Sequence, residues 1–514
     1  MRPKRKNVCQ NCRAKKLACD GAQPECSQCV FKQIRCSGYK QEFVFVGNTT
    51  VNTNVGTKSA QKKKTTFVRS TVVLDTHKLR VKTQQSASLS DTTGPVLPVE
   101  ASIVESQSCY DLEDDIQFII EQFAPANEHT FGEPSLSYNQ ICGAWINILP
   151  LIAKNRSKDY PLVPAIRALA SALRRHSNID FDGQGCRPRI VEVYCESLRH
   201  MGRAIAEARG ASNIEHITAI MCLADTDIIS PELKSGWMTH VRAVGDMLER
   251  LGPTAFSIGT MHTMFIGFRP LLLLSSILHR HGTFLAREEW ITEPFQGQPV
   301  SIIQQLLNRA CGLPALLERF YKINHISSLP DLVTVNQLEE DFHAVLSRLR
   351  EWEQAFKSQV SHPLFWSRSD PETWSLPGAN ALWFPNMMAA TSLTHYWAFE
   401  IVVRTHVSAL HQIASTAKGH NSRTHTNVYT EASAEYSLLV LADMICDSTS
   451  YLLQPVFKYH GLWSAFFTLP TALRVFRQEQ VLSSSRARRS QRIAKLLASR
   501  DVYFPENYLV QKIP

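Results

Sequence analysis

Beyond residue 108, apolar residues recur at intervals of three and four, the period of an α-helix with one buried face. The first stripe follows Asp111, a residue suited to cap a helix, and contains Leu112, Ile116, Ile119, Ile120 and Phe123. The same spacing links Ile166, Leu169, Ala170 and Leu173, and later Leu338, Phe342, Val345, Leu346, Leu349 and Trp352. The pattern predicts an amphipathic helix at each of these three places.

The rest of this region also favours helices. Further helices are predicted over 188–209, 213–228, 236–251, 300–323, 380–415, 430–453 and 486–499, and no run of alternating strands is present. Prolines predict breaks or kinks, among them Pro150, Pro253, Pro270, Pro330 and Pro470. We therefore predict that residues 108–514 form a large all-α domain of about a dozen helices or more.

Residues 41–107 lack this pattern. From Gly47 to Gln61, eleven of fifteen residues are Gly, Ser, Thr, Asn or Gln, and Thr83–Pro98 is similar. Such a composition buries too little apolar surface to offset the entropy of ordering the chain, so we predict a flexible, disordered, basic linker of low complexity. Short strands are predicted only at Phe43–Val46 and Val72–Leu74.

The composition excludes several classes of protein. The chain has 514 residues, of which 44% are hydrophobic and 20% charged, and this rules out a wholly disordered or coiled-coil chain. The longest aliphatic stretch, Pro270–Leu278, contains two serines and is shorter than the about 20 apolar residues of a membrane span. No apolar segment follows the charged start Met1–Lys6, so no secretory signal is expected. We expect an intracellular chain with no membrane partner, in which clustered cysteines bind metal.

The net charge of +9 is unevenly distributed. Residues 1–100 contain 18 Lys and Arg against 6 Asp and Glu, a balance of +12, whereas the remaining residues have a balance of −3. A basic arm on a near-neutral body predicts a polyanionic partner, either nucleic acid or an anionic surface.

Six of the thirteen cysteines lie within the first 40 residues, at Cys9, Cys12, Cys19, Cys26, Cys29 and Cys36. The spacing C-x2-C-x6-C occurs twice, with an offset of 17 residues. A gap of two residues lets both thiolates bind one metal ion from a tight turn. No histidine precedes His77, so the predicted site is all-thiolate, a donor set that favours Zn²⁺.

Two tetrahedral zinc ions need eight ligand positions, which six thiolates fill only if two of them bridge both ions. The repeat symmetry assigns this role to Cys9 and Cys26, the first cysteine of each half. The metal is then structural, and it supplies stability that about 40 residues cannot obtain from apolar burial. The other seven cysteines are scattered, and we expect them to be buried as small apolar side chains.

This segment resembles the fungal Zn2Cys6 binuclear zinc cluster of transcription factors. The resemblance rests on the six cysteines, on Arg13, Lys15 and Lys16 after the second cysteine, and on Pro24 before the fourth. Ala18 departs from it, because the family usually has Lys or Arg there. The resemblance implies a DNA-binding domain over residues 1–40 that binds two zinc ions, shared through Cys9 and Cys26.

The resemblance also assigns base contacts to Lys15 and Lys16, in the major groove of double-stranded DNA at CGG-type triplets. Arg13, Lys32 and Arg35 are expected to contact phosphates, which set the register without specifying sequence. The segment Pro3-Lys4-Arg5-Lys6 has the composition of a nuclear import signal.

Three segments of the body, Trp237–Ala243, Phe268–Leu272 and Thr283–Trp290, resemble the helical regulatory domain that accompanies fungal zinc clusters. This implies a body that senses a small-molecule effector, binds coregulators or restrains activation. Trp237 and Trp290 are candidates for lining a cavity, although tryptophans in helix cores are the commoner case. Many members of the family dimerise through a coiled coil that follows the cluster. No sustained heptad repeat is present here, so the sequence predicts no coiled coil and leaves open whether the protein is a homodimer.

Enzymatic motifs are absent from the body. It has no nucleophile elbow, H-E-x-x-H pair or phosphate-binding loop, and Gly183-Gln-Gly185 lacks a third glycine. The acidic residues at 111–115 suit a helix N-terminus, and the arginines at 486–489 suit a solvated helix face.

We predict a nuclear, zinc-dependent, sequence-specific transcription factor for RNA polymerase II genes of a metabolic or biosynthetic pathway, and no enzyme. The alternatives are an enzyme that the cluster tethers to DNA, and a repressor in which oxidation of the thiolates releases zinc.

Overall fold

The fold is described from a computed structural model of the full chain. The described residues are 12, 15, 19, 27–32, 44–49, 68–73, 111–123, 143–154, 161–176, 190–207, 213–230, 233, 236–324, 331–369, 380–417, 437–478, 486–487, 490–491 and 493. The chain divides into two compact units, Met1–Ser102 and Ile103–Pro514, and each is described by itself.

The first unit contains a short helix and two paired strands. Its elements are α2 (Ser27–Phe31), β1 (Val44–Thr49) and β2 (Val68–Val73). The strands pair antiparallel, with Val44 opposite Val73 and Thr49 opposite Val68. They overlap the two places where the linker sequence predicts strands, and their β-branched residues favour the extended backbone.

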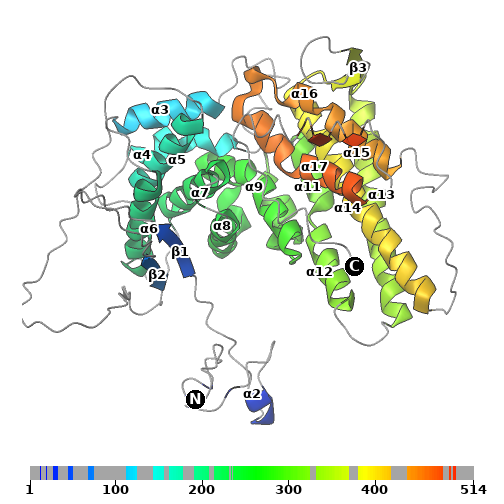
Figure 1. Cartoon of the computed structure of the whole chain (residues 1–514), viewed down its shortest axis with the longest axis horizontal. Helices are drawn as coiled ribbons and strands as arrows, with labels where there is room; N and C mark the ends of the chain where they lie inside the picture. The colour runs from blue at the N-terminus through cyan, green and yellow to red at the C-terminus, as the bar shows by residue number, and fades with distance from the viewer. Residues whose placement is uncertain are drawn as a thin grey trace, which may run out of the picture. The chain divides into compact units, whose positions relative to one another are not determined.

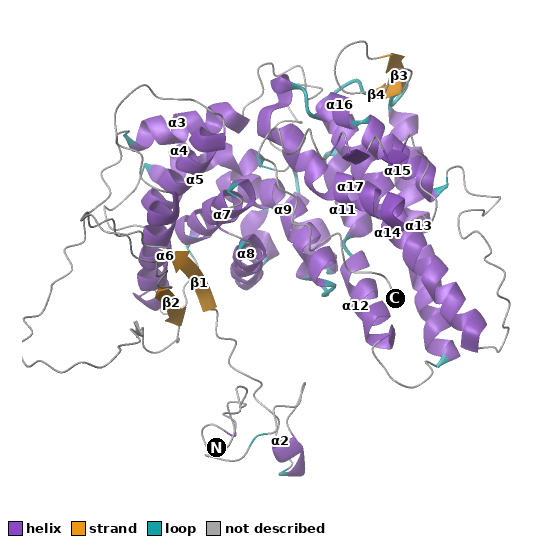
Figure 2. Ribbon diagram, viewed as in Figure 1, coloured by secondary structure: helices purple, strands orange, loops and turns teal. Residues whose placement is uncertain are grey.

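The second unit is helical, which confirms the predicted all-α body (Figures 1 and 2). Its α-helices are α3 (Leu112–Phe123), α4 (Leu149–Ala153), α5 (Leu162–His176), α6 (Ile190–Glu207), α7 (Ile214–Ile229), α8 (Trp237–Leu251), α9 (Gly259–His279), α10 (Glu288–Thr292), α11 (Ile302–Ala310), α12 (Leu313–Asn324), α13 (Leu332–Gln359), α14 (Met387–Ala417), α15 (Leu438–Asp447), α16 (Thr449–Leu452) and α17 (Lys458–Gln478). Short 3-10 helices are η3 (Ala144–Ile148), η5 (Pro253–Phe256), η6 (Phe284–Ala286), η7 (Glu293–Phe295) and η8 (Pro455–Phe457). One small antiparallel sheet joins β3 (Trp366–Ser369) to β4 (Asn380–Trp383).

Two groups of helices meet at α9. In the first group, α5 packs against α3, α6 and α7, and α7 packs against α8. In the second, the long helices α13 and α14 lie side by side, and α14 also packs against α15 and α17 (Figure 1). Helix α9 contacts η3 and α8 on one side and α11 and α12 on the other. It therefore joins the two groups.

Capping residues set several helix starts. The side chain of Asn213 accepts a hydrogen bond from the backbone N–H of Glu215 at 2.7 Å, before α7. Asp331 caps α13 through the N–H of Val333 at 3.2 Å, and Ser437 caps α15. Each satisfies a backbone donor that the first turn of a helix leaves unpaired.

Among the described residues, one helix, α9, is long and apolar enough to cross a membrane by length and composition alone. However, 72% of its apolar window is buried inside the protein. Helix α9 is therefore the core helix between the two groups of helices.

Several predicted boundaries need correction. The predicted helix 300–323 is divided into α11 and α12, because the chain turns at Cys311 and Gly312. The predicted helix 380–415 corresponds to α14, which starts only at Met387, after strand β4. Pro270 and Pro470 lie inside α9 and α17, where they do not end the helix. Neither α9 nor α17 was among the predicted helices.

The acidic residues 113–115 lie in the first turn of α3, as predicted, although one of them is buried, and Arg486 is less solvated than predicted. Asp115, in the first turn of α3, is 1% exposed and accepts a hydrogen bond from Arg174 at 2.6 Å. Burial raises the pKa of this carboxyl, and Arg174 partly opposes the change. Arg486 donates to Asp443 at 2.7 Å instead of standing free in solvent.

A buried polar network compensates for the proline in α9. Pro270 has no N–H, so the carbonyl of Ile266, one turn earlier, loses its helical partner. Gln304 of α11 donates to that carbonyl through Nε2 at 3.0 Å, and its Oε1 accepts from Arg269 at 3.0 Å. Arg269 also donates to Asn308. Burial lowers the pKa of Arg269 to about 10, so the guanidinium stays protonated at neutral pH.

Candidate metal centre and nucleic-acid interface

The described cysteines of the cluster segment are buried, whereas the other residues of this segment for which burial is described are exposed or half-buried. Cys12, Cys19 and Cys29 are 1%, 2% and 1% exposed. Lys15 and Lys32 are exposed, and Phe31 is 83% exposed. A short segment that buries its sulfur atoms rather than its aromatic side chain has the organisation of a metal-centred domain, in which the metal replaces an apolar core.

The described residues also agree with the internal repeat. Cys12 and Cys29 are 17 residues apart in the sequence, and both are helical and buried. Lys15 and Lys32 have the same offset, and both lie in exposed turns. In the second half, helix α2 continues into the turn through a bond from the N–H of Lys32 to the carbonyl of Gln28, at 3.3 Å. Each half thus places a buried thiol and an exposed lysine in equivalent positions.

These thiols fit zinc by their chemistry. Cysteine thiolates spaced by two residues are the usual ligands of structural zinc, and burial shields the centre from water. Cys9, Cys26, Cys36, Arg13, Lys16 and Arg35 lie outside the described residues, as do Lys4, Arg5 and Lys6. The described residues therefore include three of the six predicted ligands and two of the five predicted DNA contacts.

In the second unit, a buried polar cluster joins three helices. Tyr194 of α6 and His240 of α8 share a hydrogen bond of 2.8 Å, and Nε2 of His240 lies 3.5 Å from a carboxylate oxygen of Asp227 in α7. Burial raises the pKa of Asp227 to about 7 and lowers that of His240 to about 4. A Cβ at Gly236 would lie 2.4 Å from Asp227, which explains the glycine before Trp237.

This cluster is a structural connection between helices. Tyr194, Asp227 and His240 are 8%, 5% and 3% exposed, so they offer almost no surface to a substrate. In the described parts of the chain, no three His, Cys, Asp or Glu side chains are grouped to hold a metal ion.

The two tryptophans considered as cavity residues belong to the core. Trp237 and Trp290 are each 1% exposed. The ring of Trp237 packs against Phe466 at 5.6 Å, and that of Trp290 against Phe284 at 4.5 Å. Cys222, Cys311 and Cys446 are likewise buried, as expected for the scattered cysteines; Cys195 is only partly buried.

A basic thiolate-rich segment followed by a large helical body defines a class of protein, the zinc-cluster regulators of transcription. Residues 7–43 match the model of the fungal Zn(2)-Cys(6) binuclear cluster domain, and residues 134–411 match that of the fungal specific transcription factor domain. The second match covers more than half of the chain, and the chain belongs to this family of fungal-specific transcription factors. Neither a curated protein nor a solved structure matches the chain.

The family match fixes the coarse function. The protein is a fungal transcription factor that binds DNA, and its cluster domain binds two zinc ions. Both domains are those of transcription factors rather than of a known enzyme class.

Proposed function

We propose that this protein is a nuclear regulator of RNA polymerase II transcription that reads CGG-type triplets through Lys15 and Lys16. The observation that carries the proposal is the exposed turn at Lys15, three residues after the buried Cys12. In the major groove, guanine presents O6 and N7 as adjacent acceptors, which match a lysine ammonium. The base-reading half carries Arg13, Lys15 and Lys16 within four residues.

In this proposal, six thiolates hold the two zinc ions, and Cys9 and Cys26 bridge them. The bound metal supplies a rigid scaffold and no hydrolytic chemistry, because all eight ligand positions are filled by sulfur. Arg13, Lys32 and Arg35 bind phosphates. If about four cations each neutralise a phosphate, the logarithm of the binding constant falls with the logarithm of salt concentration at a slope of roughly −3.6.

The internal repeat offers a matched pair of variants that tests this division of roles. We expect Lys15→Ala to lose affinity for a CGG-containing duplex by about 1–3 kcal/mol, and to lose far less on a duplex with the triplet scrambled. Lys16→Ala should behave in the same way. Lys32→Ala, at the equivalent position of the other half, should weaken both duplexes equally and reduce the steepness of the salt dependence by about 0.9.

The assay is a fluorescence anisotropy titration of the full-length, zinc-loaded protein at four salt concentrations on both duplexes. Equal losses on the two duplexes for Lys15→Ala and Lys16→Ala would overturn the base-reading assignment. Metal analysis of the same sample should give two zinc ions per chain.

The basic segment Lys4-Arg5-Lys6 supports the nuclear address. Replacing these three residues by alanine should move a fluorescent fusion of the full chain from the nucleus toward the cytoplasm. Genome-wide mapping of binding sites would identify the pathway, which we propose to be metabolic or biosynthetic. A target set without a shared pathway would count against that part of the proposal.

A further inference from the structure

Asp227 of α7 is a buried carboxyl group that the proposed function does not use. It is 5% exposed, and neither of its oxygens has a hydrogen-bond partner among the described residues. A Cβ at Gly236 would lie 2.4 Å from one of these oxygens, so the backbone at the start of α8 covers the carboxyl group. An ionised carboxylate in this position has neither water nor a bonded donor to replace its hydration. The site therefore favours the neutral, protonated acid.

Two titratable side chains face Asp227 from neighbouring helices. Nε2 of His240, in α8, lies 3.5 Å from a carboxyl oxygen of Asp227. The same nitrogen shares a hydrogen bond of 2.8 Å with the hydroxyl of Tyr194, in α6. This hydrogen bond joins α6 to α8 directly beside the carboxyl group of α7.

The other helices that pack against α7 direct their charged groups elsewhere. On α5, Arg167 and Arg174 interact with the carboxyl group of Asp115 in α3. Helix α4 contains no titratable residue. Asp225, two residues earlier in α7, is 1% exposed, and burial raises its pKa well above the usual value, so it is neutral as well. Among the described residues of these helices, Asp227 therefore has no counter-charge.

The protonation state of Asp227 decides how this cluster is bonded. Burial raises the pKa of Asp227 to about 7, which Tyr194 partly opposes, and lowers the pKa of His240 to about 4. Between these two values the cluster has no charge, and Tyr194 remains bonded to His240. Ionisation of Asp227 creates a charged acceptor that competes with His240 for the hydroxyl proton of Tyr194. Because charged acceptors form hydrogen bonds about twice as strong as neutral ones, the carboxylate takes this donor.

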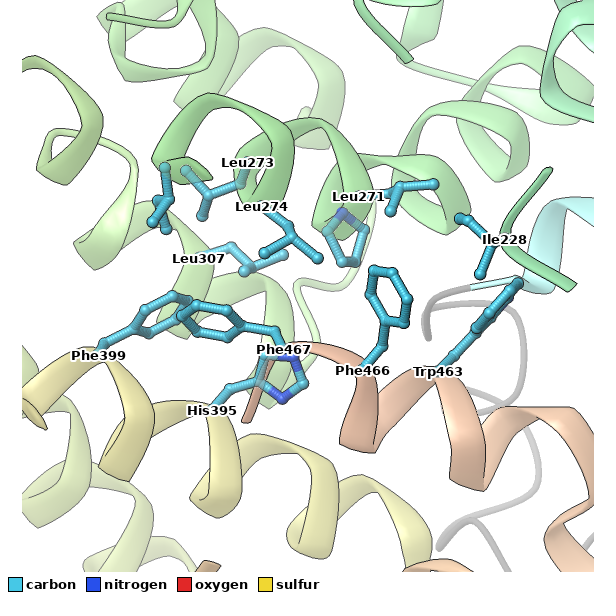
Figure 3. A pocket seen from close by; sticks show the side chains of 12 residues that line it. Ile228, Leu271, Leu273, Leu274, Leu307, His395, Phe399, Trp463, Phe466 and Phe467 are labelled. Atoms are coloured by element: carbon cyan, nitrogen blue, oxygen red, sulfur yellow. The ribbon is translucent and has the colours of Figure 1, made fainter. Parts of the chain in front are cut away.

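The start of α8 connects the cluster to the second group of helices. Trp237, directly after Gly236, is 1% exposed, and its ring packs against Phe466 of α17 at 5.6 Å. Ile228, directly after Asp227, lines a small apolar pocket together with Phe466 and with residues of α9 and α14 (Figure 3). The pocket has a volume of about 30 Å³, which suits water-sized molecules and no larger ligand. The contact with α17 is therefore incompletely filled, and a shift of α8 changes the surroundings of Trp237.

We propose that Asp227, Tyr194 and His240 form a pH-dependent switch between α6, α7 and α8. While Asp227 is protonated, the three helices are held together and Gly236 covers the carboxyl group. Loss of the proton breaks the hydrogen bond between Tyr194 and His240 and displaces the start of α8, so that water reaches the carboxylate. The displacement alters the packing of Trp237 against α17, at the junction of the two groups of helices. The switch belongs to the helical body, and its operation does not depend on DNA recognition.

Fluorine NMR of the full-length protein labelled with fluorotryptophan tests the switch. The resonance of Trp237 is assigned by its loss in Trp237→Phe. As the pH rises from about 5.5 to 8.5, this resonance should follow a one-proton titration with a midpoint near 7. The resonance of Trp290 is an internal control. It should not follow this titration, because Trp290 packs against Phe256 and Phe284 and not against the cluster.

Three variants connect the titration to the cluster. Asp227→Asn keeps the shape of the side chain but does not ionise, so it should abolish the titration of the Trp237 resonance. Asp246→Asn is the matched control, because Asp246 is an exposed acid of α8, and this variant should keep the titration. Tyr194→Phe removes the hydroxyl group that stabilises the carboxylate, so the midpoint should rise by about 1 pH unit.

Three results would overturn the proposal: no titration of the Trp237 resonance in this range, a titration that survives in Asp227→Asn, or a midpoint that does not rise in Tyr194→Phe. If Tyr194→Phe does not fold, the comparison of the natural chain with Asp227→Asn still decides the matter. An equal titration of the Trp290 resonance, or loss of the titration in Asp246→Asn, would also contradict the assignment to Asp227. No DNA is present in these measurements, so they are independent of the outcome for the proposed function.

Discussion

Replacing Gly267 by alanine should destabilise the helical body, although alanine is the better helix former. Gly267 lies inside α9, where it faces η3 at close range. A Cβ at this position would lie 2.6 Å from the backbone nitrogen of Trp145 and 3.2 Å from the Cβ of Trp145. The carbonyl of Gly267 also accepts a hydrogen bond from the N–H of Gly143 at 2.9 Å. The backbones of α9 and η3 are therefore in direct contact.

The expected magnitude follows from three contributions. Replacing glycine by alanine in a helix interior stabilises the helix by about 1 kcal/mol. To reach ordinary contact, η3 must retreat by about 1 Å, and overpacking of this kind costs about 1–3 kcal/mol. The same retreat stretches the Gly143–Gly267 hydrogen bond, which costs about 1 kcal/mol. Trp145 is 1% exposed, so η3 has no free space to move into. We expect a net loss of about 1–3 kcal/mol.

Urea denaturation of the full-length protein, followed by tryptophan fluorescence, measures this loss. All nine tryptophans lie at residue 145 or beyond, so the signal reports on the second unit. Gly245→Ala in α8 is the matched control, because its Cβ would be 3.4 Å from Leu272 and 3.6 Å from Phe284. The control should unfold at an equal or higher urea concentration. A Gly267→Ala protein as stable as the natural chain would refute the reasoning.

Three further predictions concern buried polar groups and the metal. Asp227→Asn should raise stability most at pH 8 and least at pH 4 or below. The folded-state pKa of about 7 lies above the unfolded value of 3.8, so ionisation costs stability as pH rises through this window, by up to about 4 kcal/mol. A difference in unfolding midpoint that does not change with pH would contradict this. Gln304→Met should cost about 2–4 kcal/mol, because it removes the donor to the carbonyl of Ile266 and the side-chain acceptor of Arg269. Pro270→Ala should recover part of that cost by restoring the helical N–H, and strict additivity in the double-mutant cycle would argue against the link. Removing zinc with a chelator should abolish DNA binding while leaving the tryptophan-detected unfolding midpoint unchanged, since the zinc ligands and the tryptophans belong to different compact units. A shifted midpoint would show that the stability of one unit depends on the other.

The zinc site could be predicted from the sequence because its ligands lie close together in the chain. Metal ligation by C-x2-C depends on residues close together in the chain, and the 17-residue repeat is visible without coordinates. The same holds for amphipathic helices such as α3, α5 and α13, whose single buried faces create a period of three and four.

Helix α9 was missed for the opposite reason. It is buried on nearly all sides, from His262 to Ile277, so its apolar residues show no period, and its central proline indicates a break. The proline is tolerated only because Gln304, 38 residues after Ile266, supplies the missing hydrogen bond. His395 likewise lies in a continuous buried stretch of α14, and no local pattern marks it as a pocket residue.

The sequence by itself therefore determined the zinc cluster, the basic DNA-binding arm and the helical class of the body, since each depends on residue type and short-range spacing. Only the tertiary structure decided which helices are buried, how a proline survives within α9 and which polar side chains pack between helices, as Asp227 and His240 do. These features arise from contacts between segments far apart in the chain, and burial and hydrogen-bond pairing are properties of those contacts.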